Sequence, residues 1–565
     1  MNDRIASQYL HAIAAQHLTR RALVSRTAAF GLGAVAAGAV LPGELTSTAS
    51  AASIMRQEPV PGGTLSVGIP VEPAILDAQL VGNTQEIPVA SLLYDSLFKY
   101  SPDLVLTPHI AEAVEVVDDT TYRFQIRQGV TFHNGREMTA DDVRYSLLRA
   151  KDPDLEITRR LVEMIDTVEV DDPQTVTVTL TERTPLFLHW LSAIETAIVP
   201  QEVIESEGDA FGRNPIGTGP FRFVSWESGS RITLAAFDEY FLGRPYIDEV
   251  VYRIVPDLSV VGLELENGTL DLAPFVSAED FGRLEANPNL EFGTVPQLNY
   301  WFFGMNCAEN TEVATRIGVF RDPLVRQAFY HGVDWETIAL FGLENDAFGY
   351  RQRVFYPANV PWHDPTIEEA WPQPQYDPDR ARQLLAEAGY ADGLSIETVI
   401  WNREAERIAI PLQEELAGIG VTLSIQFYEL ATWLDFVNPG DFDCYIARWT
   451  GQDSSDPYAW LYLQFHTSMF GPAGNRARFA SEAIDQMLDE AEAEPDPDLR
   501  IQKYVAAAKA LVPEIPQIPL FGTNAVSVWN PRVRDFQPDA LSSWSASVVR
   551  LWYPPYAEVW IDPNA

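Results

Sequence analysis

Hydrophobic and polar residues alternate along three segments in the N-terminal third of the chain. One segment has its apolar positions at Leu65, Val67 and Ile69, and residues 121–132 and 175–180 follow the same alternation. A period of two places the apolar side chains on one face of a strand. We therefore expect three β-strands, each with one buried face.

Three other segments carry the signals of helix ends. Thr139 can cap a helix whose first turn holds two acids. Asp377 and Pro378 stand where a second helix would begin, and Gly389 stands where it would end. The third segment, residues 480–494, is amphipathic. Because helices and strands are interspersed along the chain, the sequence predicts an α/β fold class.

The first 51 residues differ from all that follow. Arg20 and Arg21 precede an apolar run of small residues, 28–41, which is followed by a small-residue segment ending near Ala51. This order is typical of an export signal, and the paired arginines resemble a twin-arginine signal. The alternative is an ordinary secretory signal with a chance arginine pair. The apolar run is too short to span a bilayer permanently.

Composition narrows the possible partners. The chain has 565 residues, of which 46% are hydrophobic, so it has material for large cores and roughly two to four domains. Its net charge is -41, from 80 acids and 39 bases. Such a surface repels nucleic acid and anionic lipid, and we expect neither as a partner. Since no cysteine lies near the cleavage point, we expect an unlipidated periplasmic protein.

The signatures of enzymes and metal sites are missing from the sequence. We find no zinc-protease, nucleophile-elbow, phosphate-loop or paired-cysteine motif, and the histidines occur singly. We therefore expect no catalytic residue, no metal and no cofactor. Cys307 and Cys444 could form one disulfide or remain two free thiols.

One stretch, residues 447–460, mixes tryptophans and a tyrosine with aspartates, a glycine and a proline. Glycine and proline favour a loop there. Aromatic rings beside carboxylates suit neither a plain core nor a plain solvated turn. We interpret this stretch as a loop that grips a ligand.

Several segments in sequence order resemble the extracytoplasmic solute-binding proteins of peptide and nickel ABC importers, family 5. The resemblance covers about residues 62–553. It rests on segments 92–100, 108–147, 214–257, 265–274, 299–307, 320–334 and 376–393. A single fragment such as GTGPF would be weak evidence, whereas the ordered set is specific.

The resemblance implies a type II periplasmic binding protein fold, in which two hinged α/β lobes close on a ligand and a further domain is inserted in lobe I. The expected limits are residues 1–51 for the signal peptide, 62–98, 213–296 and 524–565 for lobe I, 99–212 for the inserted domain, and 297–523 for lobe II.

The function implied by the resemblance is capture of a small solute, most simply a peptide, and its delivery to an ABC permease and its ATPase. We expect the protein to act as a monomer. Within the same class of binder, a nickel chelate, haem, an opine or an oligosaccharide is an alternative ligand. A secreted hydrolase is the alternative from another class, and it would show turnover.

The resemblance also implies candidate ligand-binding residues. Trp301 and Trp449 would form cleft walls, although aromatic residues like these could equally belong to a core. Arg403 would hold a peptide carboxylate through two parallel hydrogen bonds. Asp453 would pair with the peptide ammonium, although Gln452 stands where peptide-binding relatives have the aspartate and the loop is one residue longer. Alternatively, Asp453 caps its own turn and Arg403 is a surface residue. The remaining candidates are Tyr300, Gly82, Asn83 and Thr84.

Overall fold

The computed structural model describes residues 58–564 except for short internal stretches. Those stretches are residues 82–85, 102–103, 153–154, 156–158, 160, 344, 451–454, 537–555 and 557. The predicted signal segment and the candidates Gly82, Asn83, Thr84 and Asp453 therefore lie outside the described residues.

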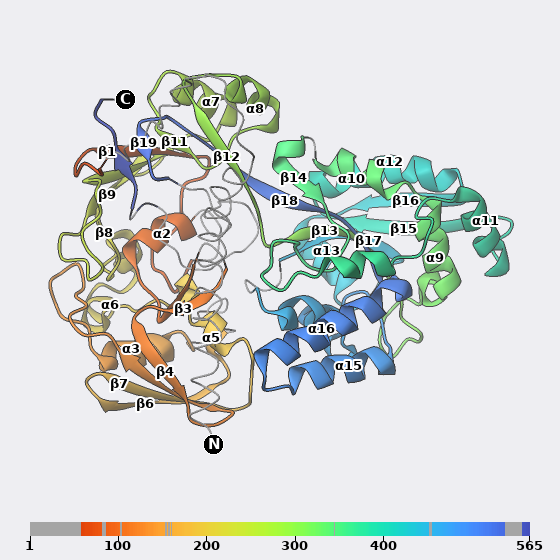
Figure 1. Cartoon of the computed structure of the whole chain (residues 1–565), viewed down its shortest axis with the longest axis horizontal. Helices are drawn as coiled ribbons and strands as arrows, with labels where there is room; N and C mark the ends of the chain where they lie inside the picture. Colours follow the sequence, from red (N-terminus) through yellow and green to blue (C-terminus); the bar gives the residue numbers. More distant parts are fainter. Residues whose placement is uncertain are drawn as a thin grey trace, which may run out of the picture.

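Two α/β bodies lie side by side and share one continuous 12-stranded sheet (Figure 1). We call them the first body and the second body. Strands of the first body are β1 (Thr64–Ile69), β8 (Phe221–Glu227), β9 (Arg231–Ala236), β10 (Glu249–Ile254) and β11 (Leu272–Ala273). Strands of the second body are β13 (Tyr300–Met305), β14 (Gly349–Arg351), β15 (Leu394–Ile400), β16 (Val421–Phe427) and β17 (Cys444–Trp449).

Strand β18 (Gln517–Trp529) belongs to both bodies. Its first part pairs antiparallel with β13 and β14, and its last part pairs with β11 and with β12 (Glu291–Pro296). Figure 1 shows β18 and β12 running side by side across the gap between the bodies. The sheet order β16-β15-β17-β13-β18-β11-β1-β10-β9-β8 follows from this shared strand.

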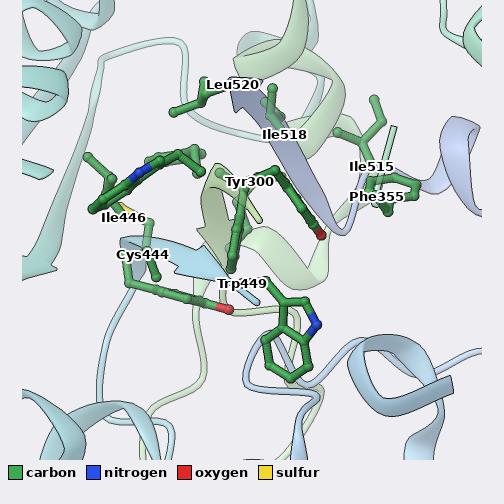
Figure 2. Close-up of a cluster of buried hydrophobic side chains, with 14 of the residues drawn as sticks. Tyr300, Phe355, Cys444, Ile446, Trp449, Ile515, Ile518 and Leu520 are labelled. Carbon is green, nitrogen blue, oxygen red and sulfur yellow. The ribbon is translucent and has the colours of Figure 1, made fainter. Parts of the chain in front are cut away.

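Helices cover the two bodies. The first body carries α2 (Ile87–Leu93), α7 (Leu258–Glu266) and α8 (Ala278–Glu285). The second body carries α9 (Pro323–Gly332), α10 (Trp335–Leu343), α11 (Pro378–Glu387), α12 (Arg403–Ala417), α13 (Leu430–Val437), α15 (Glu482–Glu492) and α16 (Pro497–Leu511). Its largest core is mainly aliphatic but holds many aromatic side chains, and Figure 2 shows Tyr300 and Trp449 among aliphatic side chains from β17 and β18.

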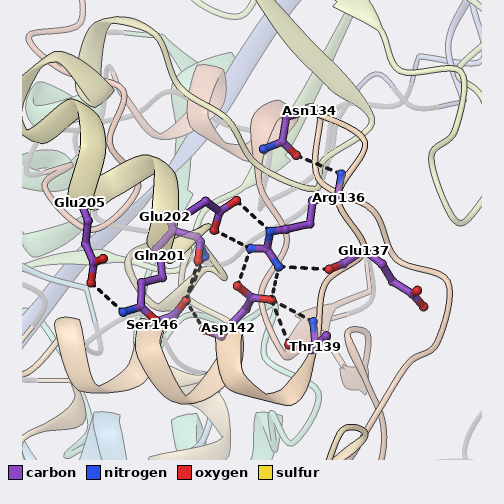
Figure 3. A network of polar contacts seen from close by, with 10 residues as sticks. Asn134, Arg136, Glu137, Thr139, Asp142, Ser146, Gln201, Glu202 and Glu205 are labelled. Atoms are coloured by element: carbon purple, nitrogen blue, oxygen red, sulfur yellow. Dashed lines mark hydrogen bonds and ion pairs between the residues drawn. The ribbon is translucent and has the colours of Figure 1, made fainter.

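A separate antiparallel sheet lies inside the span predicted for the inserted domain. Its order is β4 (Ala111–Val116), β5 (Thr121–Ile126), β7 (Thr175–Leu180) and β6 (Ile165–Asp172), and it has its own buried core with α3 (Ala140–Arg149). Arg136 joins two helices of this unit. Its guanidinium forms ion pairs with Asp142 of α3 at 2.6 Å and with Glu202 of α6 (Gln201–Glu207) at 2.8 Å (Figure 3).

The predicted α/β class and two-body fold are confirmed, and so are the local elements. Strands β1, β5 and β7 lie at the three alternating segments, although β5 ends at Ile126. Helix α3 follows its cap Thr139, and α11 follows Asp377, whose side chain accepts a hydrogen bond from Arg380 N. Helix α15 lies at the amphipathic segment. The exact limits of the lobes and of the inserted domain stay predictions.

The inserted unit is joined to the first body through His133 and two glycines. Nε2–H of His133 donates to the Gly219 carbonyl at 3.0 Å, and Nδ1 accepts from the Gly217 N–H at 3.2 Å. A Cβ at Gly217 would lie 2.1 Å from the Leu93 carbonyl oxygen, so the backbone approach requires glycine. Burial lowers the pKa of His133 to about 4, and the neutral ring matches both hydrogen bonds.

Because the pKa of His133 is lowered in the folded protein, we expect the free energy of unfolding to decrease in acid. Its folded pKa of about 4 lies below the ordinary value of 6.5, so between these pH values the unfolded chain binds a proton that the folded chain does not. Stability therefore falls as pH drops from about 6.5 to about 4, by up to about 3 kcal/mol from this one group. We expect the melting temperature of His133→Gln to fall less than that of wild type as the pH is lowered over this range. Parallel melting curves for the two proteins would contradict the assignment.

Candidate functional site

A cavity of about 430 Å³ lies where β18 passes from one body to the other. Phe275 and Val276, between β11 and α8, form its wall on the first body. Residues Phe521 and Thr523–Val526 of β18 form its floor. The remaining wall comes from the second body, so a molecule in this cavity would contact both bodies at once.

The second body contributes an aromatic wall built by strand register. Trp301 of β13 pairs with Phe521 of β18 on one side and with Arg448 of β17 on the other. The rings of Trp301 and Phe521 stack with centroids 6.0 Å apart, and the Arg448 guanidinium carbon lies 5.9 Å from the Trp301 ring centroid. Trp401 also lines the cavity. This wall can hold an apolar or planar group next to a cation.

The charged groups of the cavity are few. Among the described lining residues they are Glu404 and Arg407 of α12 and Arg448 of β17. The helix start is fixed by Asn402, whose side chain accepts from Ala405 N at 2.9 Å. Burial lowers the pKa of Arg448 to about 10, and the nearby Glu404 carboxylate opposes that shift. The cavity therefore combines two guanidinium groups with one carboxylate, which suits a ligand with carboxylates.

Tyr300 and Trp449 lie on the other face of the same strands. They pair with each other across β13 and β17, one residue out of step with Trp301 and Arg448. Tyr300 is fully buried, and its hydroxyl donates to Gln464 Oε1 at 2.9 Å. Trp449 Nε1 donates to the Ala459 carbonyl at 3.1 Å. All three residues belong to the core of the second body, and of the three only Trp301 also lines this cavity; Figure 2 shows Tyr300 and Trp449 in that core.

Arg403 is the first residue of α12, and its side chain is exposed. It stands between Asn402 and Glu404, which both line the cavity. Sequence reasoning missed Arg407, one helical turn later, and Arg448. A period-two reading of the strand before Trp449 would have placed Arg448 on the opposite face from that ring.

The stretch predicted as a loop, residues 447–460, begins instead in β17 and ends in a helical turn, Tyr458–Tyr462, because the strand pairing and the helix continue further than glycine and proline indicated. A buried ion pair anchors the segment just before that turn. The Asp456 side chain is 7% exposed, and both of its oxygens accept from Arg500 of α16, at 2.8 and 2.9 Å. It also accepts from Tyr458 N at 2.9 Å. Burial alone would raise the pKa of Asp456, but Arg500 holds it below its ordinary value. Asp456 therefore fixes the loop to α16, and His189 of the inserted unit lies 3.8 Å from it.

Three other features of the described chain are weaker candidates for a functional site: a second groove, possible metal ligands and the two cysteines. A wider surface groove of about 930 Å³ beside α15 is lined by Glu309, Glu482, Asp485, Asp489 and Glu490, with no described basic residue among its lining. Within the described chain, no group of three or more His, Cys, Asp or Glu could hold a metal ion. Cys307 and Cys444 are both free, buried thiols.

Comparison with known proteins gives one family. The model of the bacterial extracellular solute-binding proteins, family 5, middle part, matches residues 105–471. The oligopeptide-binding protein AppA of Bacillus subtilis is 29% identical over 507 residues, covering 85% of this chain and 89% of AppA. The glutathione-binding protein GsiB of Salmonella paratyphi A is 28% identical over 476 residues, covering 82% and 89%.

The solved structure of Bacillus subtilis AppA with a nonapeptide shares the fold. It superposes with a TM-score of 0.66 at 26% identity, covering 89% of this chain and 100% of the AppA chain. The similarity therefore extends over both bodies and the inserted unit.

The ion pair at Asp456 predicts a structural role for this residue. Asp456→Ala leaves the buried Arg500 guanidinium without its main partner, and we expect a destabilisation of about 3 kcal/mol, measured by chemical unfolding. The matched control is Asp379→Ala, because Asp379 is 93% exposed and also contacts an arginine, Arg382. We expect that control to change stability by less than about 0.5 kcal/mol. Equal effects of the two substitutions would contradict this role.

Proposed function

The chain belongs to the bacterial extracellular solute-binding proteins of family 5, and we propose that it captures a short peptide between its two bodies and delivers it to an ABC permease. The observation that carries this proposal is the cavity crossed by β18, whose lining comes from both bodies. A solute bound there joins the two bodies through its own contacts. Closure of two hinged bodies around a ligand is a common way to sequester it from water.

The chemistry of the cavity supports a peptide. Arg407 and Arg448 supply planar donors that match a carboxylate, and Trp301 and Trp401 supply surfaces for apolar side chains. The volume of about 430 Å³ is at the lower end of ordinary ligand pockets, which favours a short peptide over a long one. The names of the relatives AppA and GsiB, an oligopeptide binder and a glutathione binder, agree with this class.

The proposal includes the ligand contacts expected from the sequence. Trp301 is a wall of the cavity, and Arg403 would reach the solute from the exposed first turn of α12. Asp453 would hold the ammonium of the peptide at the loop that Asp456 anchors. Tyr300 and Trp449 would act from behind the wall, by holding β13 and β17 in register.

The proposed location is the periplasm, after export by the signal in residues 1–51, and the proposed partner is a permease with its ATPase. In the described part of the chain, no helix is both long and apolar enough to cross a membrane. We propose that the protein is a monomer that binds its solute without chemical change, so that uptake is stoichiometric and no product forms.

Calorimetry with di- to pentapeptides tests the ligand class. We expect the shorter free peptides to bind, and N-acetylation to weaken binding about 10- to 100-fold, because a charge-assisted hydrogen bond to the ammonium is lost. Mass spectrometry of the same samples should show the peptides intact. Failure of every peptide to bind would contradict the peptide proposal, and a nickel chelate, haem, an opine or an oligosaccharide would then be tried. A cleaved peptide would instead indicate a hydrolase.

A further inference from the structure

A second interface joins the inserted unit to the second body, away from β18. Three apolar side chains of the inserted unit, Tyr100, Leu104 and Leu186, are buried in the largest core of the second body and not in the inserted unit's own core. Figure 1 shows α5 (Phe187–Trp190), which follows Leu186, on the side of the inserted unit that faces α15 and α16. The second body therefore supplies the burial of these three side chains.

An ion pair crosses the same interface. Arg183, between β7 and α5, donates to the Glu492 carbonyl at 3.0 Å and contacts the Glu492 carboxylate at 3.4 Å. Glu492 is the last residue of α15, where the free carbonyls of the helix carry a partial negative charge that suits a cation. Its second carboxylate oxygen lies 3.4 Å from Arg500 of α16. Arg183 thus binds the inserted unit to a network that includes both helices.

The network returns to the inserted unit through the segment before the Tyr458–Tyr462 turn. Arg500 holds the Asp456 carboxylate, and His189 of α5 lies 3.8 Å from that carboxylate. Next to it, the Ser455 hydroxyl donates to the Leu104 carbonyl at 3.3 Å. All of these contacts join residues of the chain itself, so their strength does not depend on a solute.

This interface and the cavity are separate places on the molecule. None of the interface residues named above is among the described residues that line the cavity. The two bodies are therefore held at β18 and, independently, at the inserted unit. If the bodies rotate apart about the strands that connect them, contacts away from those strands must separate. Opening would expose Leu186 to water and part Arg183 from Glu492.

We infer that this interface is a closing contact, which holds the two bodies together without help from a solute, so that a solute enters only while the contact is open. The buried apolar side chains supply attraction without direction, and the ion pairs fix how the two surfaces meet. The inference rests on the hinge motion of the proposed function. It does not depend on which solute binds.

The test is small-angle X-ray scattering of the protein with no peptide added. A compact chain of this length has a radius of gyration of about 24 Å, and we expect the scattering of wild type to match the closed arrangement of Figure 1. Leu186→Glu places a carboxylate where it would be buried by the second body, which is unfavourable. We expect this variant to open and its radius to increase by about 1 Å or more.

Leu148→Glu is the matched control, because Leu148 lies on α3 of the same unit and is 40% exposed. The same substitution there should leave the scattering unchanged. Arg183→Glu is a second test variant, which sets a carboxylate against Glu492 at a partly exposed position and should also expand the protein. Melting curves establish that each variant is folded, and Arg183→Glu replaces Leu186→Glu if the latter is not.

Two results would overturn the inference. One is a wild type that is already more open than the structure, and the other is a folded Leu186→Glu or Arg183→Glu protein that stays as compact as wild type. An equal expansion of Leu148→Glu would also overturn it, because the effect would then not come from the interface. Failure of every peptide to bind would contradict the proposed function and would leave these scattering results unchanged.

Discussion

Strand β18 is the constraint on which the rest of the structure depends. Its 13 residues pair with β13 and β14 in the second body and with β11 and β12 in the first. Backbone hydrogen bonds on both sides fix the two bodies to one another at this strand. Strands β18 and β12 pair where the chain passes between the bodies, and the cavity lies at that place.

The register of β18 also decides which side chains meet in the cavity. It sets Phe521 beside Trp301, and β17 sets Arg448 on the other side of the same ring. A shift of one residue would exchange these side chains for those of the opposite face, which includes Tyr300 and Trp449. The same strand register therefore determines both the side chains that line the cavity and those that pack on the opposite face of the sheet. The ion pair of Asp456 with Arg500 holds the adjoining loop without entering the cavity.

The sequence predicted those helices and strands whose signals lie within a few residues of one another. Caps and alternation predicted α3, α11 and β1 because those signals lie within a few residues. The resemblance predicted the two-body fold, but neither signal predicted which aromatic residues line the cavity. Trp301 meets Arg448 only through pairing of strands nearly 150 positions apart, and Asp456 meets Arg500 across 44 positions. Tyr300 and Trp301 were both expected in the cleft, although adjacent residues of a strand point to opposite faces.

A crystal structure of the protein with a short peptide tests the central claim most directly. The account predicts peptide density in the cavity along β18, with contacts to Trp301 and Arg448 on one body and to the Phe275–Val276 wall on the other. Peptide density that touches only one body, or that lies in the acidic groove beside α15, would contradict the account.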